Sequence, residues 1–403
     1  MTSARRVGCL VQDLTLSGVL PAKDGYDDPE NPADVVKTLA RGLRNIRDSS
    51  VDGRLASLKL HAARLDPPII VTQEDASRMG PDRWRVHWRV AEWTFGTVCA
   101  ALAISGLHID SLDVFGSIQH CSLACDALQP ALDSNDLSTS LAQLQKLSLS
   151  LSNNLHDHNE GDGHDGETVS RFVEFCPSLV SLELHWYNTA PARPNIQSQD
   201  YLFFNTLANS VRLLYLQSLS LRGIYVTESS LLSFLSHAAP LTSLIMEETH
   251  LTTGSFTPIF ATVVLTLDHL HLDTLYSPEG MLQFFGPGKP HFPTSGEGRK
   301  GPFHLQRDGA DARQPIQYDF VSGYSLGSPD LHRRMEWRAR HYGPPPAWRQ
   351  GELVRPEMEE QQRRQQAMIE QQMQLRERQL ERQQEQQGQL EQQRQLERSR
   401  QQV

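Results

Sequence analysis

Histidine and carboxylate side chains gather at two places in this sequence where their types suit metal or proton chemistry. His269, His271 and Asp273 alternate, so a strand there would carry all three on one face. Imidazole and carboxylate groups are ligands for zinc, nickel or copper. The pattern would also suit a proton shuttle, but a plain polar strand face is the commoner outcome, and we favour it.

The second gathering is a glycine-punctuated tract from 156 to 166. Its ligand-type residues are His156, Asp157, His158, Glu160, Asp162, His164 and Asp165. The glycines would let such a loop wrap an ion, but a solvated insertion between structured elements has the same composition. We favour the solvated loop and keep metal binding as the less favoured alternative.

The sequence contains none of the common local signatures of catalysis. A Gly-rich phosphate loop, a Gly-x-Ser-x-Gly elbow and a His-Glu-x-x-His pair are all missing. We therefore expect a protein that is not an enzyme, with no catalytic residues, no assigned metal and no cofactor.

The five cysteines indicate reduced thiols. Their number is odd, and Cys121 and Cys125 have no second pair at metal-ligand spacing. No secretory leader is apparent, and the most apolar run, 97–107, is too short to cross a bilayer. We expect a soluble protein of the cytosol or nucleus that does not associate with membranes.

The charge balance argues against nucleic-acid binding. The chain has 38 Lys+Arg against 48 Asp+Glu, a net charge of −10, whereas phosphate recognition depends on basic side chains. The stretch 83–93 interleaves tryptophan and arginine, as in some single-strand binders. We interpret it as a buried helix with one charged side.

One phrase, leucine-x-x-leucine-x-leucine, recurs along most of the chain. The clear copies begin at Leu55, Leu144, Leu179, Leu216, Leu241 and Leu267, with looser copies near Ile109 and Leu14. The alternating apolar residues of each copy would face a core, while the residues between them face outward. One such strand cannot bury its face alone, but stacked copies can.

The spacers between the phrases have helical periodicity, for example over 34–46, 82–98, 168–175 and 202–214. Strand and helix therefore alternate, which predicts an α/β fold built as a leucine-rich-repeat solenoid with long, irregular repeats. A doubly wound α/β domain is the alternative. Its strands would be continuous apolar runs, whereas polar residues separate the leucines here.

The segment from Phe175 through Cys176, Pro177, Leu179 and Leu182 to Leu184 resembles the phrase of cysteine-containing leucine-rich repeats. Those repeats are common in F-box substrate receptors of cullin ubiquitin ligases. With 107–115 and 144–150, the resemblance extends to F-box-type leucine-rich proteins of filamentous fungi and covers about residues 1–285. It implies a target-binding surface and a cullin-ligase adaptor as partner.

The chain departs from that family in one respect, because no F-box precedes the repeats. The first strand phrase lies near Leu14. Either an upstream module is missing from this sequence, or this relative has lost its ligase-docking part.

If the strands stack, their outward residues form columns on one face, the concave face of a solenoid. We predict that this face binds a protein target. The candidate binding residues are Ser57, Lys59, Ser111, Asp113, Lys146, Ser181, Glu183, His185, Ser218, Arg222, Ser243, His269, His271 and Asp273. The alternative is that small hydroxyls merely suit a crowded parallel strand face.

The predicted domains are the repeats over 1–285, a Pro/Gly-rich capping extension or linker over 286–352, and a Gln/Glu/Arg-rich tail over 353–403. Short β-prone pieces at 302–306 and 316–324 would fold back onto the last repeat. The tail consists of strong helix formers, without one heptad register. A scaffold that self-associates weakly through this tail is the alternative function.

Overall fold

The computed structural model describes residues 11–20, 32–50, 52–64, 81–116, 121–133, 135–152, 165–187, 203–238, 241–286, 289–290, 303–321 and 342. Met1–Pro345 forms one compact unit and Pro346–Val403 a second. All the described residues belong to the first unit. The glutamine-rich tail and its predicted helix lie outside them.

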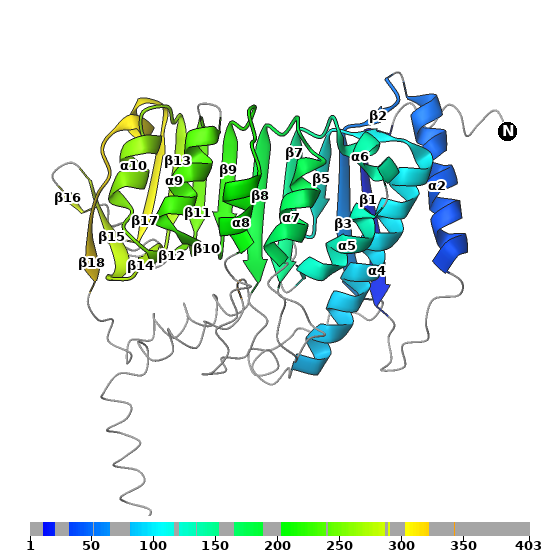
Figure 1. The fold of residues 1–403 in the computed structure, drawn as a ribbon, viewed down its shortest axis with the longest axis horizontal. Coiled ribbons are helices and arrows are strands. Elements are labelled where there is room, and N and C mark those ends of the chain that lie inside the picture. The colour runs from blue at the N-terminus through cyan, green and yellow to red at the C-terminus, as the bar shows by residue number, and fades with distance from the viewer. Residues whose placement is uncertain are drawn as a thin grey trace, which may run out of the picture. The chain divides into compact units, whose positions relative to one another are not determined.

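A ten-stranded sheet is the central feature of the first unit (Figure 1). Its strands follow one another across the sheet in chain order, and each is parallel to its predecessor until the last. They are β1 (Asp13–Leu20), β3 (Ser57–Arg64), β5 (Ser111–Val114), β7 (Lys146–Ser152), β8 (Ser181–Tyr187), β9 (Ser218–Arg222), β11 (Ser243–Glu247), β13 (His269–Asp273) and β17 (His304–Asp308), with β6 (Leu123–Ala124) beside β7.

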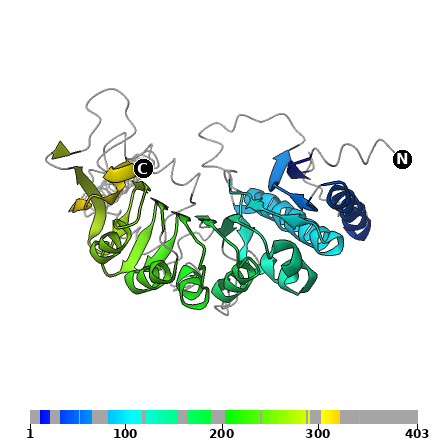
Figure 2. The ribbon, with the colours of Figure 1, turned by 90° about the horizontal axis from the view of Figure 1, so that it is seen from above.

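The described helices connect successive strands and cover one face of this sheet. Seen from above, the sheet curves with the helices on its outer side and the strands on its inner side (Figure 2). We call the opposite, inner face of the ten-stranded sheet the strand face. The helices are α2 (Pro32–Ser49), α4 (Pro81–Ser105), α5 (Gln129–Leu132), α6 (Asn135–Leu141), α7 (Asp165–Glu174), α8 (Phe203–Ser210), α9 (Glu228–His237) and α10 (Thr257–Val263), with the 3-10 turns η1 (Cys125–Leu128) and η3 (Gly309–Arg313).

The strands form because each carries apolar residues at alternate positions, and these side chains are buried between sheet and helices. The middle leucines of successive phrases are paired in register across the sheet. They are Leu58, Leu112, Leu147, Leu182, Leu219, Leu244 and Leu270, each 0–2% exposed. Packing of this leucine ladder against the helices holds neighbouring strands and helices together.

The entry to each strand repeats the same backbone hydrogen bonds. Two successive N–H groups at the start of a strand donate to one carbonyl of the previous repeat. Gln217 and Ser218 donate to the Val180 oxygen at 2.8 and 3.0 Å, and Thr242 and Ser243 donate to Gln217 at the same distances. The same pairing recurs at the acceptors Asp110, Gln145 and Thr242. These bonds satisfy main-chain groups that would otherwise be orphaned between strands.

The exit from the strands repeats as well, because the residue after the strand has a left-handed backbone conformation in four repeats. These residues are Phe115, Gly223, Glu248 and Thr274, with φ between 48° and 70°. Glycine adopts this conformation without strain, whereas the other three are held there by the surrounding structure. The turn directs the chain away from the principal sheet.

Three strands of a second, six-stranded sheet follow the turns at Gly223, Glu248 and Thr274. Tyr225, His250 and Tyr276 occupy equivalent positions and stack, with ring centroids 4.5 and 4.4 Å apart. Such aromatic stacks stabilise neighbouring strands beyond their buried area. The strands are β10 (Tyr225–Thr227), β12 (His250–Thr253), β14 (Tyr276–Ser277), β15 (Gly280–Gly286), β16 (Lys289–Pro290) and β18 (Gln317–Val321), and a separate small sheet pairs β2 (Arg54–Leu55) with β4 (His108–Ile109).

The pairing changes from parallel to antiparallel at the C-terminal end of the sheets. β17 lies antiparallel to β13, and β18 lies antiparallel to β15. β18 falls within the piece 316–324 that was expected to fold back, and β17 overlaps the piece 302–306 but extends beyond it to Asp308. β17 covers the edge of β13, which would otherwise present unpaired backbone groups to solvent.

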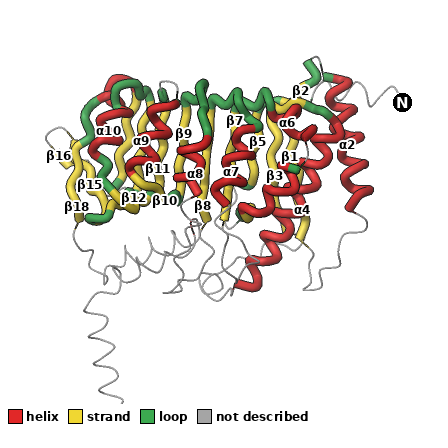
Figure 3. Tube along the Cα trace, in the orientation of Figure 1, coloured by secondary structure: helices red, strands yellow, loops and turns green. Residues whose placement is uncertain are grey.

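The predicted α/β class is confirmed, since helices and the strands of a large parallel sheet alternate along the chain (Figure 3). The helix predicted over 202–214 is shorter than expected, because α8 ends at Ser210. Within the described part of the chain, no helix combines the length and apolarity that crossing a membrane requires.

Candidate binding surface

The structure places the predicted strand-face columns side by side. One column consists of the residue just before each middle leucine. In this column the backbone pairing runs from Ser111 through Lys146, Ser181 and Ser218 to Ser243. It continues to His269, while Ser57 lies on β3 at the equivalent place. Because the pairing is in register, residues up to 158 positions apart in sequence form one continuous polar row.

The candidate binding residues differ in how far their side chains are exposed to solvent. Lys59 and Lys146 are exposed, whereas His185 is buried. The other candidates are half-buried: Ser57, Ser111, Asp113, Ser181, Glu183, Ser218, Arg222, Ser243, His269, His271 and Asp273. A partner would therefore meet the two lysines as the most projecting charges of the set.

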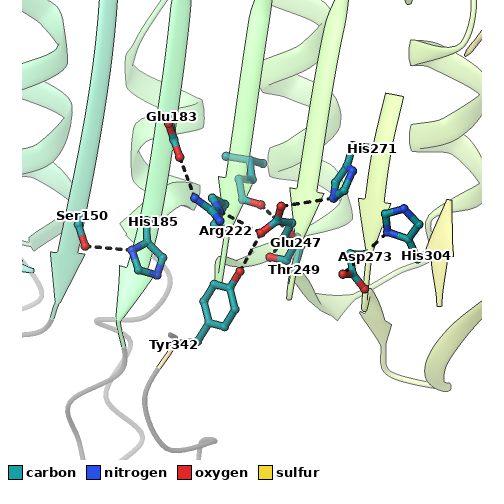
Figure 4. A network of polar contacts seen from close by, with 11 residues as sticks. Ser150, Glu183, His185, Arg222, Glu247, Thr249, His271, Asp273, His304 and Tyr342 are labelled. Atoms are coloured by element: carbon teal, nitrogen blue, oxygen red, sulfur yellow. Dashed lines mark hydrogen bonds and ion pairs between the residues drawn. The ribbon is translucent and has the colours of Figure 1, made fainter. Parts of the chain in front are cut away.

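Arg222 is the centre of a charged network on β8, β9 and β11 (Figure 4). Its Nη1 donates to Glu183 Oε1 at 3.1 Å, and its Nε donates to Glu247 Oε2 at 3.0 Å. His271 Nε2 lies 3.3 Å from the other Glu247 oxygen. Arg222 and Glu247 are direct register partners on β9 and β11, whereas Glu183 lies two residues before the register partner of Arg222 on β8. Arg222 thus has an acidic neighbour on each side.

Burial alone would raise the pKa of Glu247, but the network outweighs this effect. The hydrogen bond from His271, the charge of Arg222 and the hydroxyl of Tyr342 together lower the pKa of Glu247 to about 2. Burial lowers the pKa of Arg222, yet Glu247 and Glu183 raise it above its ordinary value. Both groups are therefore charged across the physiological range.

Tyr342 contacts this network from a distant part of the chain. Its hydroxyl donates to Glu247 Oε2 at 3.0 Å, and its ring meets the edge of the His185 ring at 5.3 Å between centroids. At Gly223, with φ of 70°, a Cβ would lie 2.7 Å from Cδ1 of Tyr342 and 2.5 Å from the Trp186 carbonyl oxygen. Glycine at this turn therefore allows both the backbone path and the tyrosine contact.

His185 is oriented by a hydrogen bond to a neighbouring strand. Its Nδ1 lies 3.0 Å from Ser150 Oγ, and the Ser150 hydroxyl donates to the Cys121 carbonyl at 2.9 Å. Because the serine proton is committed to Cys121, His185 Nδ1 is the donor in this pair. The histidine is a structural part of the strand face with Tyr342 against its ring.

The expected cluster of His269, His271 and Asp273 is only partly assembled. His269 Nδ1 instead pairs with Asp308 Oδ1 at 2.6 Å. The position next to Asp273 is taken by His304 of β17, which is its direct backbone partner. One ligand-type atom from each of His271, Asp273 and His304 lies within 4.8 Å of the others.

Two other sequence features have different outcomes. The acidic histidine tract at 156–164 lies outside the described residues. Trp88 is buried and Arg89 is exposed on α4, as expected for a packed helix with a charged side. The side chains at 83–87 lie outside the described part.

The described cysteines, Cys99, Cys121, Cys125 and Cys176, are buried. Burial raises the pKa of Cys121 to about 12 and raises those of Cys99 and Cys176 further. Because the thiolate is the reactive form, we expect these three to resist iodoacetamide in the native chain at pH 8 and to react after denaturation. Peptide mass spectrometry measures this, and native labelling at the rate of an exposed thiol would contradict it.

Sequence reasoning missed Tyr342, His304 and the aromatic stack. The stack had a signal, because Tyr225, His250 and Tyr276 recur at the spacing of the leucine phrases. The other two had none, since their neighbours on the strand face are distant in sequence. Compared with known proteins, the chain matches no family model and no curated protein.

Proposed function

We propose that this protein is a leucine-rich-repeat solenoid that binds a protein target on its strand face and performs no catalysis. The observation that carries the proposal is the continuous in-register row of polar side chains from β3 to β13, opposite the helix-covered face. Curved repeat proteins bind partners on such extended inner surfaces.

The charges of the surface support a protein target in preference to a nucleic acid. Lys59 and Lys146 project, but Arg222 is already paired with Glu183 and Glu247. A phosphate backbone requires many unpaired basic groups, whereas a folded protein or peptide can match a surface of both signs. The network charges would supply specificity, because a partner that offers them no matching hydrogen bonds would still remove their water.

The link to ubiquitin ligases is proposed from the sequence resemblance alone, namely the phrase around Cys176 together with 107–115 and 144–150. If the chain is a substrate receptor, it recruits a cullin and its adaptor in addition to the target. If it is a stand-alone binding protein, the target is recovered without ligase subunits.

The test is affinity purification of the tagged full chain from its own cells, with quantitative mass spectrometry. We expect Lys59→Glu combined with Lys146→Glu to lower recovery of the main partners at least tenfold, since two projecting charges are reversed. Arg171→Glu on α7 is the matched control, because it reverses an exposed charge on the helix-covered side.

Equal recovery by the double variant and the unmodified chain would refute binding on the strand face. Recovery of the cullin and its adaptor would support the receptor form of the proposal. Absence of the cullin and its adaptor from all preparations would exclude the receptor form and leave target binding alone as the proposed function.

A further inference from the structure

We propose that His271, Asp273 and His304 form a binding site for a divalent transition-metal ion, with Zn²⁺ as the first candidate. This inference is independent of the proposed target binding. It rests on three side chains that two antiparallel strands bring to one place at the C-terminal end of the strand face (Figure 4).

The backbone explains why the three side chains meet. His271 and Asp273 are two residues apart on β13 and therefore point to the same face. His304 is the direct cross-strand partner of Asp273 on β17, and directly opposed residues of an antiparallel pair hold their side chains close together. The imidazole rings of His271 and His304 are 4.8 Å apart between centroids.

The donor set suits a transition metal. Two imidazoles and one carboxylate match zinc sites that keep a position open for water or another ligand. The ligand atoms of tetrahedral zinc lie about 3.3 Å apart, so separations of up to 4.8 Å need modest side-chain rotation. The three side chains are 14–38% exposed, which leaves room for that rotation and a route for the ion.

Neighbouring groups hold two of the ligands in place. His271 Nε2 is 3.3 Å from Glu247 Oε1, so Nδ1 is the ring nitrogen that remains for the ion, as in a carboxylate–histidine–metal arrangement. Thr274 Oγ1 donates to Asp273 Oδ1 at 2.7 Å, while Oδ2 is the oxygen nearer to His304, at 3.9 Å from its Nδ1. Such outer contacts fix ligand orientation and raise metal affinity.

The experiment is Zn²⁺ titration of the full chain, purified in chelator and then freed of it, by isothermal calorimetry and metal analysis. We expect about one Zn²⁺ per chain and a higher thermal unfolding midpoint, because the ion joins β13 to β17. His304→Gln and Asp273→Asn should each lower the affinity at least tenfold.

Two controls separate this site from other histidines. His269→Gln replaces a histidine on the same strand, β13, whose side chain is paired with Asp308 and lies outside the proposed site. This variant should bind zinc as tightly as the unmodified chain. The triple variant His156→Gln, His158→Gln and His164→Gln removes the other histidine tract and should also keep the site. Circular dichroism of each metal-free variant checks that it is folded.

The Co²⁺ complex of the unmodified chain gives a second measurement that needs no variant. Visible d–d bands of a four-coordinate nitrogen–oxygen site are expected, and zinc should abolish them. Failure of the unmodified chain to bind Zn²⁺ at 100-fold excess would overturn the proposal. So would unchanged affinity in folded His304→Gln and Asp273→Asn, or loss of the ion in the triple variant alone.

Discussion

Leu219→Ala should lower the free energy of unfolding by about 3 kcal/mol. Leu219 lies on β9 in the middle of the leucine ladder, is 0% exposed, and is paired in register with Leu182 and Leu244 on either side. Removing its side chain leaves a cavity that parallel strands fixed by backbone hydrogen bonds cannot close. Urea unfolding of the full chain, monitored by circular dichroism, measures the change.

The matched control is the same substitution at an exposed leucine. Leu214 is 66% exposed at the connection before β9, so Leu214→Ala should change stability by less than about 0.5 kcal/mol. Equal effects at the two positions would show that the ladder does not form the core. A small effect at Leu219 would mean that the repeats are packed more loosely than the structure indicates.

Glu247→Gln should lower the free energy of unfolding at pH 7 by about 2 kcal/mol. This loss is smaller than that for breaking a fully buried ion pair, because solvent reaches the network and screens its charges. Glutamine has the shape of glutamate but no charge, so it loses the attraction to the Arg222 guanidinium. The Arg222 guanidinium would keep Glu183 as its remaining partner.

The same substitution has a defined pH dependence. The pKa of Glu247 is lowered from 4.5 to about 2 in the folded chain, so its charged form stabilises the fold above about pH 4.5. This stabilisation is lost as the pH falls from 4.5 towards 2. The stability difference between the unmodified chain and Glu247→Gln should therefore be largest near neutral pH and shrink through that acidic range.

Asp34→Asn is the control for the loss of a carboxylate charge. Asp34 pairs with Lys37 on α2, and both side chains are largely exposed, so the substitution should cost less than about 1 kcal/mol. A Glu247→Gln effect no larger than this, or one independent of pH between 2 and 7, would contradict the role assigned to the network.

Much of the architecture was predictable because its signals are local. Leucines at alternate positions predict a strand with one buried face, and helical periodicity between the phrases predicts the covering helices. The polar residues between the leucines, such as Ser181 and Ser218, were assigned to the opposite face for the same reason. Neighbouring phrases then align because each strand can bury its leucines only against the next.

The site was less predictable. His269, His271 and Asp273 alternate on one strand, which predicted that they form one cluster. In the structure, however, His269 pairs with Asp308 instead. His304 enters the cluster only because β17 returns antiparallel to β13, and no residue pattern near 304 specifies that pairing. Side-chain partners depend on which strand lies alongside, and here that strand is more than thirty residues away.

The sequence alone determined the α/β class, the strand positions and the polar columns, since periodic burial requires only neighbouring residues and the demand that apolar faces be covered. Tertiary structure alone decided that Arg222 is held between two glutamates, that Tyr342 bonds Glu247, and that two strands bring His271, Asp273 and His304 together. These arrangements depend on contacts between distant segments, whose cost in chain entropy is offset only when the whole fold forms.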